Sequence, residues 1–451
     1  MDGNLWVSSR DLYFDIHSML GSENELLETG YLIDVPSSSI VERRLNLDMS
    51  RDEFVKRVNQ FVKNFQGPMI ESILVNFYLK REQSNSIDQW IKVAFAMGVE
   101  RIDLLFLGKP YAHDTTQRKR YKFDFDLFYV TNAATLKNLY LQNCVVCHPT
   151  NDFIPSKNLR SLSLESSKVD AMSVESLLTN CELLEELCLS FCEVKSSMLK
   201  IVSSSLCHLK VVGCYVVSHK FFDNADFKVM DYVNLILVDC LNLTSLEYDG
   251  RGLDTLNINT PVLKSIKFSI SLKGDLNAFV GLCATFPELE AMHVTTFSMV
   301  TTSLKITQPL KHLKELKLDI MLNSDIINDV EYDPLWILNI LQTAPLLQKL
   351  SVMFLHLELF KSQRDIRDVE IFSHEELKVI ELRGCIGDWL EIEFVMNVLK
   401  CAHKLEQIVL SPYLRDVSSD WESHHVWYQS GRDRISEKLQ GVEGQEKVVL
   451  I

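Results

Sequence analysis

The spacing Leu-x-x-Leu-x-Leu recurs along this chain of 451 residues, with other apolar residues replacing a leucine in several copies. Each copy alternates apolar and polar positions, as a half-buried β-strand does. We therefore expect one short strand per copy. The copies begin at residues 136, 159, 184, 206, 243, 263, 289, 313, 347, 377 and 405, with two weaker copies at 70 and 99.

Successive copies from residue 136 onward start 20 to 37 residues apart. Most of these steps lie in or near the range of about 20–29 residues that leucine-rich repeats use. The longer steps indicate inserted loops or a missed copy. Four copies place a cysteine eight residues after the first leucine, where such repeats bury an Asn or Cys. These are Cys144, Cys192, Cys214 and Cys385.

Helical patterns lie between several of the expected strands. Capping-box sequences at residues 50–53 and 86–89 predict helices that begin there and run to about residues 65 and 97. Further helices are expected over 275–286 and 335–344. Strands that alternate with helices predict an α/β leucine-rich-repeat solenoid, with a curved parallel sheet on the concave side and helices and turns on the convex side.

A single repeat of this kind cannot bury its own apolar faces, so the copies must stack. We expect Leu139 to pack against Leu162, and Leu162 against Leu187. Each fully buried leucine contributes about 1.5–3 kcal/mol, so the stacked leucines supply the largest favourable term.

Composition narrows the class of protein and of partner. With only 16 Gly and 11 Pro, the chain is neither collagen-like nor broadly disordered. Its net charge of −15 opposes binding to a phosphate backbone, so no nucleic-acid partner is expected. The basic cluster Arg118 to Lys122 is followed at once by Asp124 and Asp126, and we interpret it as a solvated loop.

The chain has no run of 18 apolar residues and no basic and apolar leader at its first residues. We therefore expect neither a membrane partner nor export. An odd count of 11 cysteines then favours reduced thiols and a cytoplasmic or nuclear location, or both.

Catalytic motifs give little signal. The phosphate-binding glycine loops and the Gly-x-Ser-x-Gly elbow are absent from the sequence, so we expect no cofactor and no enzyme. Cys144 to His148 matches the Cys-x-x-Cys-His haem motif, but no second Cys-x-x-Cys would complete a metal site, and Cys144 already fits the buried repeat position. His424 and His425 form either a metal or binding patch or an exposed polar loop, and we favour the loop.

What remains is the surface of the sheet. If the repeat leucines point inward, their neighbours in each strand face the concave side. These positions are polar and lightly aromatic, which suits a protein partner better than a polyanion. The residues that we predict to contact a partner are Tyr140, Gln142, Glu165, Glu186, Lys210, His293, Lys317, Asp319, Lys349 and Arg383.

Several segments resemble one known family. Residues 50–107, with the turn 66–68 and the stretch 87–91, are similar to the segment after the F-box in plant F-box/FBD/LRR proteins. Residues 376–412 resemble the FBD region of that family. Trp6 and residues 11–15 look like the tail that directly follows an F-box.

This resemblance implies three segments: an N-terminal segment or cap over 1–49, the repeat array over 50–375, and an FBD-like region and tail over 376–451. We expect the last part of the tail to cap the array. The resemblance also implies a substrate receptor of an SCF-type ubiquitin ligase, whose repeats bind the target protein. The Skp-type linker of the ligase would dock on an F-box, which we expect this chain to lack.

Three interpretations of the lacking F-box stay open: a truncated gene product, an alternative start, or an F-box-less paralogue. The alternatives to a substrate receptor are therefore a scaffold or truncated paralogue without a ligase link. A thiol or metal hydrolase is a third hypothesis, for which a strongly acidic thiol or bound metal would be needed.

Overall fold

The computed structural model describes most of the chain. The described residues are 10–21, 37–67, 69–106, 120–131, 133–147, 157–222, 225–250, 260–270, 285–286, 288–296, 309–321, 335–355, 367, 372–385, 387, 389–411 and 431–451, with side chains left out for 37–49 and for parts of a few strands and helices. They form two compact units, Met1–Leu243 with Asn257–Asn259, and Thr244–Leu256 with Thr260–Ile451. We call these unit 1 and unit 2.

Unit 1 is built on a parallel sheet that contains one strand from each early repeat. Its order follows the sequence, because each repeat adds its strand beside the one before. Both weaker copies, at residues 70 and 99, are confirmed as strands of this sheet. The strands are β1 (Asp11–Phe14), β2 (Ser72–Asn76), β3 (Arg101–Leu105), β5 (Asn138–Gln142), β7 (Ser161–Glu165), β9 (Glu186–Ser190) and β12 (His208–Val212).

The repeat leucines form rows across this sheet. Leu139 pairs in register with Leu162, and Leu162 with Leu187, as predicted. All three are buried, while the residues between the leucines of β5 and β7 are only half-buried. The alternation that predicted the strands is therefore the alternation between the core and one face of the sheet.

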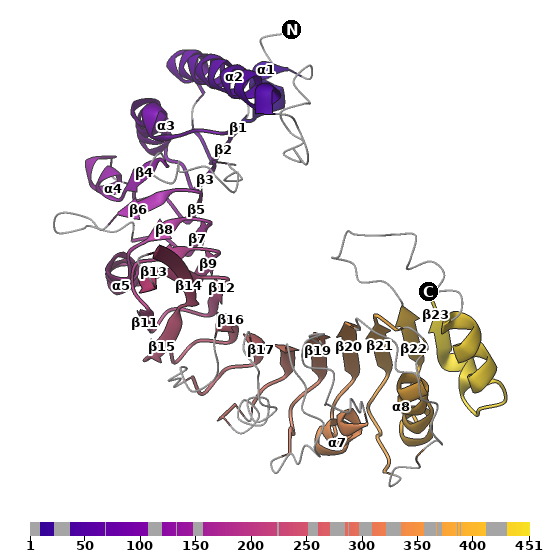
Figure 1. Ribbon diagram of the computed structural model, residues 1–451. Coiled ribbons are helices and arrows are strands. Elements are labelled where there is room, and N and C mark those ends of the chain that lie inside the picture. Colours follow the sequence, from indigo (N-terminus) through magenta and orange to yellow (C-terminus); the bar gives the residue numbers. More distant parts are fainter. Residues whose placement is uncertain are drawn as a thin grey trace. The chain divides into compact units, whose positions relative to one another are not determined.

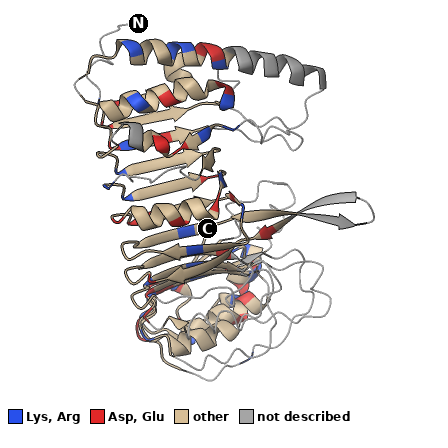
Figure 2. Ribbon diagram, turned by 90° about the vertical axis from the view of Figure 1, so that its left-hand side faces the viewer, with Lys and Arg blue, Asp and Glu red and all other residues tan. Residues whose placement is uncertain are grey.

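A second sheet backs the first in unit 1. All but one of its parallel strands have only two or three residues. Figure 2 shows that the strands of the protein consist mostly of residues other than Lys, Arg, Asp and Glu, drawn in tan. The strands of the second sheet are β4 (Lys122–Asp124), β6 (Val145–Cys147), β8 (Lys168–Val169), β10 (Glu193–Val194) and β13 (Tyr215–Phe222), with β14 (Ala225–Tyr232) antiparallel at the edge. Beside β4 an aromatic cluster fills the core, in which Phe123 contacts Tyr121, Phe125 and Phe128.

The longest step between copies, from residue 206 to residue 243, contains an insertion. The hairpin β13–β14 occupies part of it, and β15 (Asn234–Val238) then pairs in parallel with β11 (Met198–Val202). This step thus contains an inserted hairpin and one further strand, where the repeat spacing predicted an inserted loop or a missed copy.

The helices of unit 1 are α1 (Ile16–Leu20), α2 (Ser37–Asn64), α3 (Ser84–Ala96), α4 (Asp126–Thr131) and α5 (Ala171–Asn180). In Figure 1 three of them, α3 to α5, lie on one side of the parallel sheet of unit 1, and α1 and α2 lie at its N-terminal end. Helix α2 docks through Phe54, which stacks on Phe77 with ring centroids 4.3 Å apart. It is tied to α3 by a 2.7 Å hydrogen bond that Trp90 Nε1 donates to Asn59 Oδ1.

Two predicted helix starts were wrong. Ser50 lies inside α2, which begins at Ser37 because no Gly or Pro interrupts residues 37–64. Helix α3 begins at Ser84, so Ser86 sits in its first turn and is not its N-cap. The predicted segment boundary at residues 49 and 50 also falls inside α2.

Unit 2 repeats the same plan. Its parallel strands are β16 (Ser245–Gly250), β17 (Ser265–Ile270), β18 (Ala291–Thr296), β19 (Glu315–Met321), β20 (Lys349–Leu355), β21 (Val379–Arg383), β22 (Gln407–Ser411) and β23 (Val448–Leu450). Helices α7 (Trp336–Thr343) and α8 (Trp389–Cys401) back β19 to β22 (Figure 1). Helix α7 confirms the helix expected over 335–344, whereas 275–284 of the other expected helix lie outside the described residues.

The C-terminal segment adds to this sheet. Strand β23 pairs in parallel with β22, and the helix over 431–439 buries Ile435 and Leu439. Gly387 allows a close approach to that helix, because a Cβ placed there would lie 2.5 Å from the carbonyl oxygen of Gly431. The short 3-10 turn Gln445–Lys447 leads into β23.

The cysteines at the recurring repeat position contribute to the packing between neighbouring repeats. Cys144, Cys192, Cys214 and Cys385 are all buried, as predicted. The thiol of Cys192 lies 3.2 Å from the carbonyl oxygen of Leu164, and that of Cys214 lies 3.4 Å from that of Leu189, each one repeat earlier. A small side chain with a weak donor therefore satisfies a carbonyl at the end of the neighbouring strand.

Within the described ranges, no helix is both long and apolar enough to cross a membrane.

Replacing Leu162 by Ala is expected to lower the free energy of unfolding by about 2–5 kcal/mol, because it opens a cavity within a row of stacked leucines. The matched control is Leu183→Ala, at a turn residue that is 42% exposed; its effect should stay within about 0.5 kcal/mol. Urea denaturation followed by tryptophan fluorescence measures both. Equal losses for the two variants would contradict the stacked core.

Candidate functional site

The strands display one set of side chains on the face of each parallel sheet opposite to the buried leucines. In β21, Ile380 and Leu382 are buried, while Val379, Glu381 and Arg383 are half-buried. We call this the open face of each unit. All ten residues predicted to contact a partner lie in its strands, at positions that alternate with the buried apolar residues.

In unit 1 the structure brings three of the predicted residues together. Tyr140 donates its hydroxyl hydrogen to Glu165, and Gln142 Nε2 donates to the other carboxylate oxygen of Glu165 over 3.1 Å. Burial, and then the hydrogen bond to Glu165, raise the pKa of Tyr140. The phenol therefore stays protonated and keeps its role as donor.

Glu186 and Lys210 occupy other rows of the same face. Glu186 pairs in register with Ser161 and with His208, at the N-terminal ends of the strands. Lys210 pairs in register with Cys188, in the row of Tyr140.

In unit 2 the centre of the open face is Asp319. Its carboxylate lies 2.6 Å from His293 Nε2, 3.2 Å from Lys317 Nζ and 3.4 Å from Arg383 Nη2. These residues come from β18, β19 and β21, so Arg383 reaches across β20. The structure thus joins four of the predicted residues in one charged network.

Asp319 differs from the expected partner-facing side chain, because only 7% of the residue is exposed. Burial alone would raise the pKa of Asp319. The hydrogen bond and positive charge from His293, with Lys317, outweigh burial, so the pKa is lowered. Asp319 therefore holds the surrounding cations in place rather than offering a free carboxylate.

The remaining predicted residue of unit 2, Lys349, pairs with Glu381 over 2.7 Å. The cationic side chains on this face stay partly accessible: 36% for Lys317, 45% for Lys349 and 30% for Arg383. A partner could therefore contact these groups while their ion pairs with Asp319 and Glu381 stay intact.

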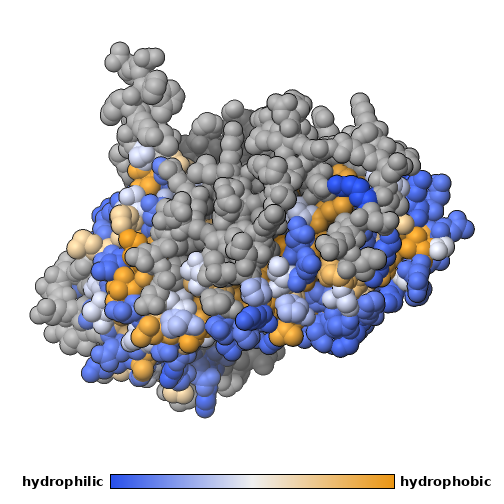
Figure 3. All heavy atoms as spheres, turned by 90° about the horizontal axis from the view of Figure 1, so that it is seen from below, coloured by the Kyte–Doolittle hydropathy of each residue, from blue (hydrophilic) through white to orange (hydrophobic). Residues whose placement is uncertain are grey.

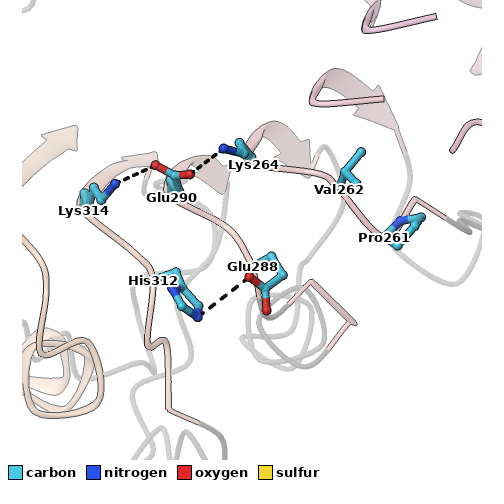
Figure 4. Close-up of a pocket in the computed structure, with 7 residues that line it drawn as sticks. All are labelled: Pro261, Val262, Lys264, Glu288, Glu290, His312 and Lys314. Carbon is cyan, nitrogen blue, oxygen red and sulfur yellow. Dashed lines mark hydrogen bonds and ion pairs between the residues drawn. The ribbon is translucent and has the colours of Figure 1, made fainter. Parts of the chain in front are cut away.

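A second charged feature lies at the N-terminal ends of the strands, outside the open face. Lys264, Glu290 and Lys314 precede β17, β18 and β19 and border a hollow of about 290 Å³ (Figure 4). Glu290 lies 2.7 Å from Lys314 and 3.1 Å from Lys264, and these two ammonium groups lower its pKa to about 2.

The same position pairs across other repeats as well, as Lys137 with Glu100 and Arg160 with Glu185. The charges in the hollow are thus part of a recurring ladder between neighbouring repeats, and they already have partners. The face seen in Figure 3 shows mostly hydrophilic residues with small, separated hydrophobic patches among its coloured atoms. Neither feature competes with the open face as a recognition surface.

The alternative chemistry has little support among the described residues. They hold no group of three or more His, Cys, Asp or Glu suited to a metal ion. Burial raises the pKa of both Cys144 and Cys147, so neither is an activated thiolate. His148, His424 and His425 lie outside the described residues, as does Trp6.

Sequence reasoning overlooked two residues beside the site. Asp103 is buried in β3 and lies 2.8 Å from Arg101 Nε; the signal was a carboxylate inside the apolar run 102–106. Phe191 directly follows β9 with a φ of 54°. The signal was its place in the repeat, where Asn143 and Gly213 stand after β5 and β12.

Replacing Asp319 by Asn is expected to lower the free energy of unfolding at pH 7 by about 1–3 kcal/mol, because its cations lose their charged acceptor. The pKa of Asp319 is below its usual 3.8, so its contribution is present above that pH and is lost as the pH falls further. The difference between wild type and variant should therefore shrink below about pH 4.

Urea denaturation from pH 7 to pH 3 measures this difference, with the half-buried Glu376→Gln as the control. The control should change stability by less than about 0.5 kcal/mol at pH 7. A difference between wild type and Asp319→Asn that did not vary with pH would contradict the charged network.

Known proteins share this architecture. Residues 62–443 match the family model described as the LRR domain of At1g61320/AtMIF1. Among relatives from Arabidopsis thaliana, the F-box protein At5g03100 is 28% identical over 181 residues, which cover 40% of this chain and 51% of the relative.

The putative F-box/LRR-repeat protein At4g00320 is 28% identical over 223 residues, 48% of this chain and 40% of the relative. The putative F-box/LRR-repeat protein At5g02700 is 26% identical over 137 residues, 29% of this chain and 27% of the relative. The matches thus span about half or less of the length of these relatives. They support a protein-interaction module, and the leucine-rich-repeat fold and resemblance expected from the sequence are confirmed. Because the family model covers most of the chain, this protein belongs to the plant leucine-rich-repeat family of At1g61320/AtMIF1.

Proposed function

We propose that the repeat array is a receptor that binds a target protein through the open face. The observation that carries this proposal is the network around Asp319. A buried carboxylate there orients His293, Lys317 and Arg383, three groups that can donate hydrogen bonds, on a solvent-facing sheet. Preorganised polar groups of this kind give specificity in protein recognition.

We further propose that the array serves as the substrate receptor of an SCF-type ubiquitin ligase. Two supports are the F-box names of the Arabidopsis relatives and the resemblance of residues 50–107 to the segment after an F-box. In this arrangement an F-box docks on the Skp-type linker, and the repeats bind the target protein and determine the specificity. A form of the protein without an F-box would act as a scaffold instead. Both arrangements place the protein in the cytoplasm, the nucleus or both.

The experiment is affinity capture from plant extract with three immobilised proteins. These are the wild type, the open-face variant Lys317→Glu/Lys349→Glu, and the control variant Lys314→Glu/Lys404→Glu. The control reverses two lysines of similar exposure that also pair with a glutamate, but that precede their strands instead of lying on the open face. Circular dichroism verifies that all three are folded.

We expect at least one protein to be retained by the wild type and the control, and to fall about tenfold or more on the open-face variant, which corresponds to about 1.4 kcal/mol of binding free energy. Equal retention by all three proteins would contradict the open face as the receptor surface. A Skp-type linker among the retained proteins supports the ligase receptor, whereas target capture without that linker favours the scaffold.

A further inference from the structure

Phe191 has an unusual backbone conformation for an aromatic residue. It follows β9 with a φ of 54°, in the left-handed region that bulky side chains avoid. The equivalent corner after β5, β7 and β12 holds Asn143, Ser166 and Gly213, all with positive φ. Those small or polar residues tolerate this conformation much better than phenylalanine does. Strained residues of this kind persist mainly where they serve a function.

The ring of Phe191 is held at the surface. The residue is 58% exposed, so its side chain does not compensate for the strain by entering the core. The ring lies directly against Gly213 in the next repeat, where an added Cβ would lie 2.5 Å from Phe191 Cδ1. Gly213 thus leaves room for an aromatic ring that stays largely exposed to solvent.

Hydrogen-bond acceptors lie on the open face in the strands that precede β9 in the sheet. Ser190, which precedes Phe191, pairs in register with Glu165 of the neighbouring strand. The Glu165 carboxylate accepts hydrogen bonds from Tyr140 and Gln142, which are both neutral donors, and none of the described residues forms an ion pair with it. Gln142 Oε1 is a further acceptor, buried and without a hydrogen-bond donor among the described residues.

We propose that Phe191 and Glu165 together form a subsite for an arginine side chain of the bound protein. The guanidinium stacks on the ring of Phe191 and donates hydrogen bonds to Glu165, whose charge has no cationic partner in the described part of unit 1. Arginine fits better than lysine, because its planar group can stack on a ring and bind a carboxylate at the same time. The net charge of −15 also favours a basic segment. This inference rests on the proposed receptor function and names the chemistry of one contact.

The test uses fluorescence anisotropy with two labelled nine-residue peptides. One alternates arginine with serine, and the other carries neutral citrulline in place of each arginine. The proteins are the wild type, Glu165→Gln, Phe191→Leu and Phe191→Gly. The controls are Glu406→Gln, which removes an exposed carboxylate in unit 2, and Leu183→Ala, which truncates an exposed apolar side chain in unit 1.

We expect the arginine peptide to bind the wild type about tenfold more tightly than the citrulline peptide, since only arginine offers a charge for Glu165 and the ring. Glu165→Gln and Phe191→Gly should each weaken binding about fivefold or more, and Phe191→Leu about threefold, because leucine keeps the apolar area and loses the ring. The two controls should bind as the wild type does.

Phe191→Gly also separates a binding role from a structural one. Glycine relieves the positive φ, so we expect an unchanged or higher melting temperature together with the loss of affinity. A lower melting temperature with unchanged affinity would overturn the proposal. So would equal binding of the two peptides, or an equal loss of affinity in Glu406→Gln, which would indicate a general effect of charge.

The two proposals can fail separately. Suppose that capture from extract depends on Lys317 and Lys349, while the affinity for the peptide does not depend on Phe191 and Glu165. The receptor function then stands and the arginine subsite is wrong. If the peptide depends on Phe191 and Glu165 while capture is insensitive to the open-face lysines, the subsite stands and the broader receptor surface is wrong.

Discussion

The structure depends on the register in which apolar side chains stack from one strand to the next. Within unit 1 the row of Ile102, Leu139, Leu162, Leu187 and Leu209 joins five successive strands. Each strand pairs with its neighbours in parallel, and each leucine is buried only because the neighbouring repeats supply their own. Since side chains alternate along a strand, the same register fixes every residue of the open face.

The open face uses this rigid frame to hold charged groups near each other. In unit 2, Asp319 is desolvated, which is costly, and its interactions with His293 and Lys317 outweigh that cost. In unit 1, Glu165 is held by Tyr140 and Gln142 without a cation. The two units thus present different chemistry on the same fold: fixed cations in unit 2 and fixed acceptors in unit 1. Variation of this kind allows related repeat proteins to bind different partners.

Much of the fold could be predicted, because the repeat leaves a periodic trace in the sequence. The leucine spacing located the strands, including the weak copies at residues 70 and 99, and the position of Cys192 and Cys214 indicated their burial. The start of α2 was missed, because Ser50 matches a capping box. No Gly or Pro lies between Ser37 and Ser50, so the helix begins earlier, at Ser37. The hairpin β13–β14 was not predicted, since the long step that it occupies indicated only an inserted loop or a missed copy.

The site was predictable in position but not in chemistry. Strand alternation placed Tyr140 and Glu165 on the open face of unit 1 and Arg383 on that of unit 2, yet it could not show which residues each of them contacts. The pairing of Arg383 with Asp319 joins residues 64 positions apart and crosses an intervening strand. The positive φ of Phe191 arises at the turn that follows the strand of each repeat. The leucine spacing gives no information on the backbone conformation of that turn.

Cysteine accessibility along β7 tests most directly whether the leucines are the buried set and their neighbours the displayed set. Ser161→Cys, Leu162→Cys, Ser163→Cys and Leu164→Cys would be alkylated under native conditions, with modification quantified peptide by peptide. Cysteines at 161 and 163 should react at least about tenfold faster than those at 162 and 164, because a buried thiol is protected. Uniform rates, or faster reaction at 162 and 164, would contradict the stacked register and the recognition surface that depends on it.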